Sequence, residues 1–218
     1  KTPGAEAPTR RNGTRGLYWH EPLVEVECAD GRIAYGPVGE RDVPTLLAAG
    51  MLKGAAHALR LGPIEQHPWF ASQQRLTFAR VGRIDPLDLA AYRASGGYKG
   101  LARALELAPE AAVNEVLESG LRGRGGAAFP TGIKWQTVLR QPKGQKYITC
   151  NADEGDSGTF SDRMLMEGDP FSLIEGMTIA GFAVGADRGY IYLRVEYPHA
   201  YAVLDAAIEA AGGGGLVG

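Results

Sequence analysis

The residues best suited to ligand chemistry lie in a glycine-rich segment, GLRGRGGAAFPTGIKW, at positions 120–135. Five of its sixteen residues are glycine, and Arg122, Arg124 and Lys134 supply positive charge. Glycines lack a Cβ and let backbone N–H groups converge on an anion, and a helix opened by Thr131 would add its positive N-terminal dipole. We interpret the segment as a candidate loop for a phosphate or an electron-rich ring. A tight turn between two helices is the alternative.

Part of this segment, Gly123-Arg-Gly125-x-x-Ala128, matches the dinucleotide fingerprint G-x-G-x-x-(G/A). That fingerprint normally follows a strand and precedes an acidic residue at a fixed offset. Here a helix is expected before Gly120, and no acidic residue follows at that offset. A stand-alone Rossmann-type nucleotide binder, the alternative interpretation, would require a strand before Gly120.

A second polar segment, NADEGDSG at positions 151–158, directly follows a short apolar strand expected at Tyr147–Asn151. In open α/β sheets, ligands bind beyond the carboxyl ends of the strands. An asparagine and carboxylates there could accept hydrogen bonds from a ring N–H or from ribose hydroxyls. The alternatives are a solvated turn with a helix N-cap at Ser161 or Asp162, acid–base catalysis, and Mg²⁺ binding. A cationic glycine loop at the same sheet edge favours nucleotide recognition.

Composition excludes several classes of protein. The net charge of −2 gives no electrostatic footprint for nucleic acid, and the longest stretch without a charged residue, Gly176–Ala186, is 11 residues against about 20 for a membrane span. Cys28 and Cys150 stand 122 positions apart, which is typical of a cytoplasmic protein with reduced thiols. The four histidines have no metal-ligand spacing.

The order of elements predicts how these segments are positioned. The 31 glycines divide unevenly, with 10 in residues 1–95 and 21 in residues 96–218, which indicates two units. Alternating strands and helices in the second unit predict a parallel sheet with covering helices, although two strands make an incomplete sheet. The expected strands are Leu23–Cys28, Ile33–Tyr35, Tyr147–Asn151 and a buried one at Tyr190–Val195. Helices are expected over 42–52, 53–61, 85–95, 98–108, 109–119 and 169–186, and from Pro198 onward.

Single residues outside the two loops suggest less chemistry. Arg194 and Glu196 flank the end of the last strand and are interpreted as a surface pair. Cys150 is interpreted as a buried strand residue, because no histidine lies near it in the sequence.

The first segment, together with KYITCNADEGDSGTFSDRM and GDPFSLIEGMTIAGFAVGA, resembles the family of flavin (FMN)-binding diaphorase subunits. That family includes the NADH-oxidising FMN subunit of complex I, the diaphorase of NAD-reducing hydrogenases and the β subunit of NAD-dependent formate dehydrogenases. The upstream segment GLYWHEPLVEVE also resembles this family, and the chain as a whole most closely resembles the formate dehydrogenase type. It implies an α/β fold: a partial thioredoxin-like α+β domain over residues 1–71, then the N-terminal part of a Rossmann-like FMN/NADH-binding domain over residues 72–218.

The resemblance also implies roles for individual residues. Hydride chemistry belongs to FMN, so no catalytic residue is expected. Three positions depart from the complex I pattern: Ala128 replaces a glycine, Thr137 replaces an adenine-stacking phenylalanine, and Asp156 replaces a glutamate that holds the adenosine ribose. The implied FMN-binding residues are Gly123, Gly125, Lys134, Asn151, Asp153 and Glu154. The implied NAD-binding residues are Gly126, Phe129, Glu154 and Asp156.

The implied activity is that of a diaphorase module, which passes a hydride between nicotinamide and FMN and electrons onward to iron–sulfur clusters. Expected partners are a [2Fe–2S] thioredoxin-like γ-type subunit and a molybdenum- and iron–sulfur-containing α-type subunit. Two cysteines cannot ligate the family's [4Fe–4S] cluster, so its ligands and the rest of the FMN pocket are expected beyond Gly218. The alternatives are the hydrogenase or complex I subunit, and a structural docking fragment without flavin.

Overall fold

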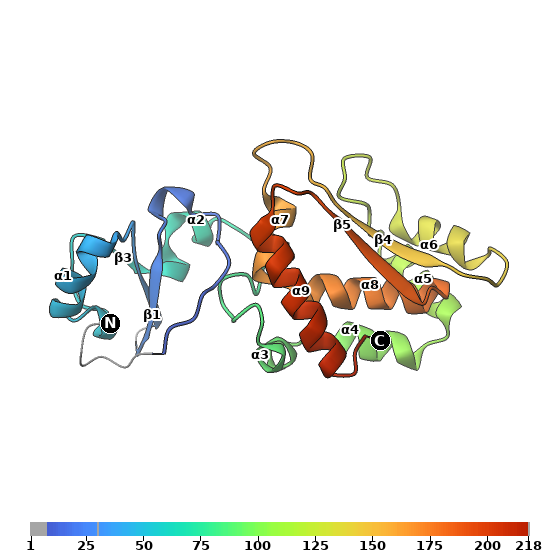
Figure 1. Cartoon of the computed structure of the whole chain (residues 1–218), viewed down its shortest axis with the longest axis horizontal. Helices are drawn as coiled ribbons and strands as arrows, with labels where there is room; N and C mark the ends of the chain where they lie inside the picture. The colour runs from blue at the N-terminus through green and yellow to red at the C-terminus, as the bar shows by residue number, and fades with distance from the viewer. Residues whose placement is uncertain (1–7, 30, 218) are drawn as a thin grey trace. The chain divides into compact units, whose positions relative to one another are not determined.

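The computed structural model describes residues 8–29 and 31–217. Asp30, in the expected hairpin turn, and residues 1–7 of the expected first domain lie outside the described residues. The chain divides into two compact units, residues 1–79 and 80–218, which are described separately (Figure 1). No helix in the described ranges is long and apolar enough to cross a membrane.

The first unit contains a three-stranded antiparallel sheet in the order β1-β2-β3. Its strands are β1 (Val24–Cys28), β2 (Gly31–Tyr35) and β3 (Arg60–Pro63), so the expected hairpin is present. The helices around it are α1 (Val43–Ala48), α2 (Pro68–Ala71) and the 3-10 turns η1 (Tyr18–His20), η2 (Glu40–Asp42), η3 (Met51–Lys53) and η4 (Ile64–Gln66).

Two expected helices of the first unit are shortened or absent. The helix expected through residue 52 ends at Ala48, because Gly50 takes the left-handed conformation with φ of 86°. The prediction of a helix over residues 53–61 is wrong. Gly54, with φ of 74°, closes η3, and the chain then enters β3. The thioredoxin-like identity of this unit and the boundary at residues 71 and 72 remain predictions.

The second unit confirms the predicted α/β class, with a small parallel sheet. Strands β4 (Tyr147–Ala152) and β5 (Arg188–Leu193) are parallel, and Asn151 pairs with Tyr192 in their register. The crossover between them contains α7 (Ser161–Gly168) and α8 (Pro170–Val184). The other helices are α3 (Leu89–Ala94), α4 (Lys99–Glu106), α5 (Pro109–Glu118), α6 (Thr131–Leu139) and α9 (Pro198–Gly213).

One helix start and one helix cap in this unit differ from the sequence expectation. The helix expected from residue 85 begins at Leu89. Asp88 caps it by accepting from the Ala91 N–H at 2.9 Å, while the Asp85 side chain accepts from the Leu87 N–H and closes the preceding turn. Asp169 stands at the N-cap of α8, but its carboxylate pairs with Nε of Arg80 at 2.9 Å instead of capping the helix.

The two faces of the parallel sheet differ in burial. Cys150, Ala152, Ile191 and Leu193 point inward and pack in a core with residues of α7 and α9. Their neighbours along the strands point outward, so the expectation that residues 190–195 form a buried strand is wrong for this face: Tyr192 is 67% exposed. Parallel sheets are normally covered on both faces. The outward face therefore leaves side chains at the carboxyl ends of the strands accessible. These outward residues are Tyr147, Thr149, Asn151, Tyr190 and Tyr192.

Candidate functional site

The glycine loop, residues 120–130, connects α5 to α6 and is closed by its own backbone. Gly123 N–H donates to the Phe129 carbonyl at 2.9 Å, and Thr131 N–H donates to the Leu121 carbonyl at 2.9 Å. The Arg122 guanidinium donates to the Ala128 carbonyl at 3.1 Å. The loop is therefore a compact, hairpin-like projection held at its base.

The tip of the glycine loop leaves backbone donors accessible. A Cβ built on Gly125 or Gly126 would meet nothing within 4 Å, and Gly126 has a left-handed φ of 97°. Within the described part of the chain, no backbone hydrogen bond engages the N–H groups of residues 124–127. Free N–H groups in a glycine turn form a concavity of the kind that binds anionic groups such as phosphate.

Gly132 serves the packing that supports this loop. A Cβ at this position would lie 2.4 Å from Cα of Leu117, so α6 approaches α5 at backbone distance. The close helix pair fixes both ends of the loop that connects it.

Two further predicted residues flank the loop. Lys134 is exposed on the first turn of α6, and among the described residues its ammonium has no carboxylate partner. Phe129 is 49% exposed at the base of the loop. A free ammonium can bind a phosphate, and a half-exposed ring can stack on a base.

The acidic loop, residues 151–158, begins with the last two residues of β4 and continues beyond the carboxyl end of the parallel sheet. Asn151 Oδ1 accepts from the Asp153 N–H at 3.1 Å, which turns the chain away from the strand. A cavity of about 410 Å³ lies here, lined by Thr149, Asn151, Asp153 and Tyr192. Asp156 is exposed farther along the loop. The structure thus brings the predicted Asn151 and Asp153 together at one cavity, in the position where α/β sheets bind ligands.

Glu154 takes a different position from its two neighbours. Its carboxylate accepts four hydrogen bonds: Oε1 from the Ser161 hydroxyl at 3.3 Å and the Asp162 N–H at 3.0 Å, and Oε2 from the Arg163 N–H at 3.0 Å and the Tyr197 hydroxyl at 3.2 Å. The N-cap expected at Ser161 or Asp162 is thus supplied by Glu154 from outside the helix. A carboxylate has about four lone-pair sites, so these donors occupy them all.

The charge of Glu154 influences the groups around it. Burial, and secondly the Glu154 carboxylate, raise the pKa of Asp162. The same two causes raise the pKa of the Tyr197 hydroxyl and keep it a donor. Burial, and secondly Asp162, raise the pKa of the Cys150 thiol. Because a thiol is nucleophilic only as thiolate, Cys150 acts as a strand residue of the core.

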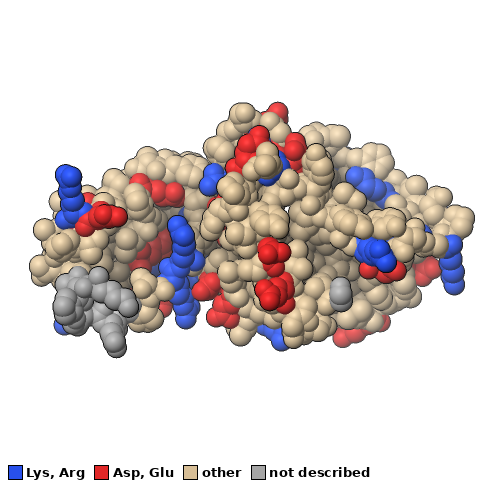
Figure 2. Space-filling model, viewed as in Figure 1, with Lys and Arg blue, Asp and Glu red and all other residues tan. Residues whose placement is uncertain are grey.

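The glycine loop and the acidic loop both project from the upper side of the second unit in Figure 1. Figure 2 shows acidic side chains, with a basic one among them, over the place that the acidic loop occupies in Figure 1. The sequence predicts that both loops bind the same cofactor, so both are parts of the candidate site.

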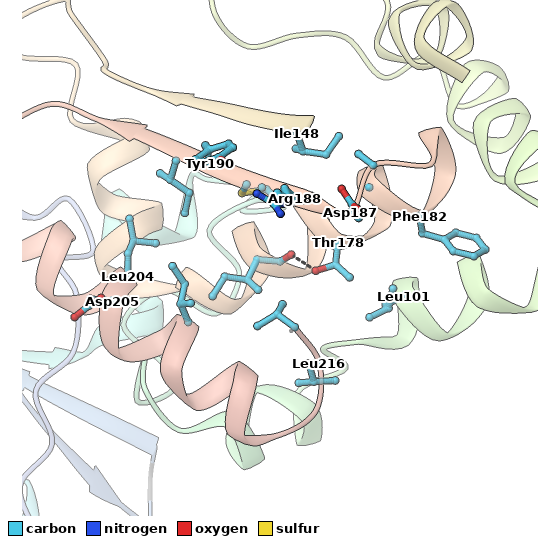
Figure 3. Close-up of a pocket in the computed structure, with 18 of the residues that line it drawn as sticks. Leu101, Ile148, Thr178, Phe182, Asp187, Arg188, Tyr190, Leu204, Asp205 and Leu216 are labelled. Carbon is cyan, nitrogen blue, oxygen red and sulfur yellow. Dashed lines mark hydrogen bonds between the residues drawn. The ribbon is translucent and has the colours of Figure 1, made fainter. Parts of the chain in front are cut away.

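A larger apolar cavity of about 800 Å³ lies below β5, between α8 and α9 (Figure 3). Leu101 of α4, Ile148 of β4, Leu204 of α9 and Leu216 line it, with Asp187 and Arg188 among its few charged residues. None of the predicted FMN or NAD residues lines this cavity. Its walls are mainly apolar side chains of α8, α9 and β5.

Residues 116–215 match the family described as the Nuo51 FMN-binding domain. The matched region contains the glycine loop, the acidic loop and both strands of the parallel sheet. The comparison therefore supports the FMN assignment for the part of the chain that forms the candidate site.

Curated relatives align with about two thirds of this chain. The HndC subunit of the NADP-reducing hydrogenase of Solidesulfovibrio fructosivorans is 51% identical over 146 residues, 67% of this chain and 30% of that protein. An NADH-quinone oxidoreductase subunit of Aquifex aeolicus is 47% identical over 140 residues, 64% of this chain and 32% of that protein. The relative of the same name in Escherichia coli (strain K12) is 48% identical over 156 residues, 71% of this chain and 34% of that protein. The chain spans about a third of the length of these relatives.

A solved structure supports the fold. The NAD⁺-reducing [NiFe]-hydrogenase in the H₂-reduced state aligns with a TM-score of 0.51 at 30% sequence identity, over 83% of this chain and 30% of that chain. With the family match, this likeness confirms the predicted flavin-binding α/β class and supports FMN and NAD as the cofactors of this kind of domain.

Proposed function

We propose that this chain forms part of an FMN- and NAD(H)-binding diaphorase subunit in a multisubunit oxidoreductase. The observation that carries the proposal is the pairing of a glycine loop with free N–H donors and a polar loop at the carboxyl end of a parallel sheet, both within the FMN-binding family match. The chemistry supplied by bound FMN is hydride exchange with a nicotinamide and one-electron exchange with a redox centre.

The chain's own residues would bind and orient the cofactors. The N–H groups of residues 124–127 and the Lys134 ammonium would neutralise the negative charge of FMN. At the cavity wall, the Asp153 carboxylate would accept hydrogen bonds from the flavin, and the Asn151 amide would accept or donate them. For NAD(H), we propose that Gly126 allows close approach, the exposed Phe129 ring stacks on the adenine, and Asp156 binds the adenosine ribose.

The test uses the purified protein that contains this chain. It is expected to bind FMN with a visible flavin absorbance and to reduce an artificial acceptor with NADH. Asn151→Ala and Lys134→Ala are expected to weaken FMN binding at least about tenfold, as loss of hydrogen bonds to charged or buried groups does. Asn114→Ala and Lys143→Ala, on exposed positions outside both loops, are the matched controls. A protein that folds but binds no FMN would instead support the structural docking role.

The parent complex is a finer proposal. The sequence resemblance favours the β subunit of a cytoplasmic NAD-dependent formate dehydrogenase, with the γ-type and α-type partners described above. Subunits of hydrogenase and of NADH-quinone oxidoreductase fit the same site at least as well, because the aligned relatives carry those names. Native purification followed by assays with formate, hydrogen and quinone separates the three. We expect NAD⁺ reduction that depends on formate. Activity with hydrogen alone or with quinone alone would instead assign the chain to a hydrogenase or to an NADH-quinone oxidoreductase.

A further inference from the structure

Arg194 and Tyr197 follow β5 and both contact Glu154 in the acidic loop. Nη1 of Arg194 donates to the Glu154 carbonyl oxygen at 2.6 Å, and the Tyr197 hydroxyl donates to Glu154 Oε2 at 3.2 Å. We propose that Arg194 and Tyr197 are positioning residues that hold the acidic loop in the shape that receives the flavin. This inference rests on the proposed function of the same site.

Glu154 needs such support because of its backbone. Its φ of 43° lies in the left-handed region, which side chains with a Cβ rarely adopt. The residue keeps this conformation when neighbouring contacts over-determine it. The carboxylate is fixed by the N-terminus of α7, and the carbonyl is fixed by a charged donor from the segment after β5.

The Arg194 guanidinium is itself held in one orientation. Its Nε and Nη2 donate to the two carboxylate oxygens of Glu196, each at 3.2 Å. Its centre lies 5.0 Å from the centroid of the Tyr197 ring. A planar guanidinium bound on one side by a carboxylate presents its remaining nitrogen in a fixed direction, here toward Glu154. The sequence suggests that Arg194 and Glu196 form a surface pair. In the fold, this pair also orients the Arg194 guanidinium toward the acidic loop.

Tyr197 connects the loop with two helices. It is buried, stands at the N-cap of α9, and its ring centroid lies 5.7 Å from the Arg163 guanidinium of α7. This cluster holds Glu154 in place. Glu154 directly follows Asp153, and Asp153 lines the cavity together with Asn151. Loss of the cluster would release the loop on which both flavin contacts depend.

The test measures FMN dissociation constants by fluorescence titration of the FMN-depleted protein, together with its melting temperature. Arg194→Ala is expected to weaken FMN binding about tenfold and Tyr197→Phe about threefold, as losses of a charged and a neutral hydrogen bond. Arg194→Lys is expected to recover part of the affinity, because an ammonium keeps the charge without the fork. Arg188→Ala and Tyr201→Phe, at exposed positions away from the loop, are expected to bind FMN as the unchanged protein does.

The outcomes separate the two proposals. Wild-type FMN affinity in Tyr197→Phe and in both Arg194 variants would overturn the positioning role while leaving the proposed function intact. A lower melting temperature with unchanged affinity would also overturn it, since that result describes a purely structural contact. If Arg194→Ala does not fold, Tyr197→Phe and Arg194→Lys decide the question. An unchanged protein that binds no FMN would refute the proposed function itself.

Discussion

The hydroxyl of Tyr92 donates a hydrogen bond to Oε2 of Glu175 at 2.5 Å, although 83 positions separate them in the sequence. Glu175, on α8, also accepts from the N–H groups of Tyr98 at 2.7 Å and Leu101 at 3.0 Å, at the start of α4. Glu154 performs the same task for α7. Both helices begin after an aromatic residue with a left-handed φ, Tyr98 at 61° and Phe160 at 54°. The N-termini of α4 and α7 are therefore each capped by a glutamate from outside the helix.

Replacing Glu175 should reduce stability markedly. Glu175→Gln keeps one acceptor oxygen and places an amide donor against N–H groups, so we expect the free energy of unfolding to fall by about 2 kcal/mol. Urea unfolding followed by circular dichroism measures the change. Glu115→Gln, which breaks an exposed ion pair with Arg103, should cost under about 1 kcal/mol. Equal losses in the two variants would contradict the capping role of Glu175.

Stability should decline at alkaline pH because of Tyr92. Burial, and secondly the hydrogen bond to Glu175, raise the pKa of Tyr92 well above its ordinary value. In the unfolded chain a tyrosine loses its proton near pH 10, while folded Tyr92 retains it. Its contribution is therefore complete below about pH 10 and is lost as the pH rises further, by about 1.4 kcal/mol per pH unit.

Tyr92→Phe tests this origin of the alkaline decline. The variant should show a shallower fall of the unfolding free energy between about pH 10 and pH 11 than the unchanged protein. Tyr201→Phe, at a position that is 63% exposed, should retain the original slope. Identical slopes in all three proteins would assign the decline to other groups.

Gly132→Ala should disrupt the support of the glycine loop. The added methyl group would stand 2.4 Å from Cα of Leu117, so α5 and α6 must separate. We expect a loss of at least about 2 kcal/mol in the free energy of unfolding, as overpacking against backbone produces. Gly144→Ala, where a Cβ meets nothing within 4 Å, is the control for a general effect of alanine. A stable Gly132→Ala protein would show that the helix pair adapts.

Gly125→Ala should separate folding from binding. A Cβ at Gly125 meets nothing within 4 Å and the residue has no left-handed φ, so the melting temperature should stay within a few degrees of the unchanged protein. FMN affinity should nevertheless fall at least about tenfold if the flavin approaches this backbone closely, since such a contact tolerates no added methyl group. Titration with FMN and a thermal melt measure the two effects, and unchanged affinity would remove Gly125 from the binding surface.

Local patterns in the sequence determined the α/β class and the two loops. Gly125 and Gly126 indicate a loop with free backbone donors, and the apolar strand at residues 147–152 places Asn151 at its carboxyl end. Each inference depends on residues within a few positions of one another. The propensities of glycine, proline and alternating apolar residues act over that range.

Only the tertiary structure decided which groups complete these loops. Glu154 caps α7 from seven to nine positions away, and Arg194 reaches the Glu154 carbonyl from 40 positions away. Parallel pairing of β4 with β5 aligns Ala152 with Leu193, and this register brings Arg194 to the loop. A hydrogen bond depends on distance and direction in space, and the types of two distant residues do not encode these. For the same reason, the sequence suggested that Arg194 was a surface residue, whereas the fold makes it a support of the candidate site.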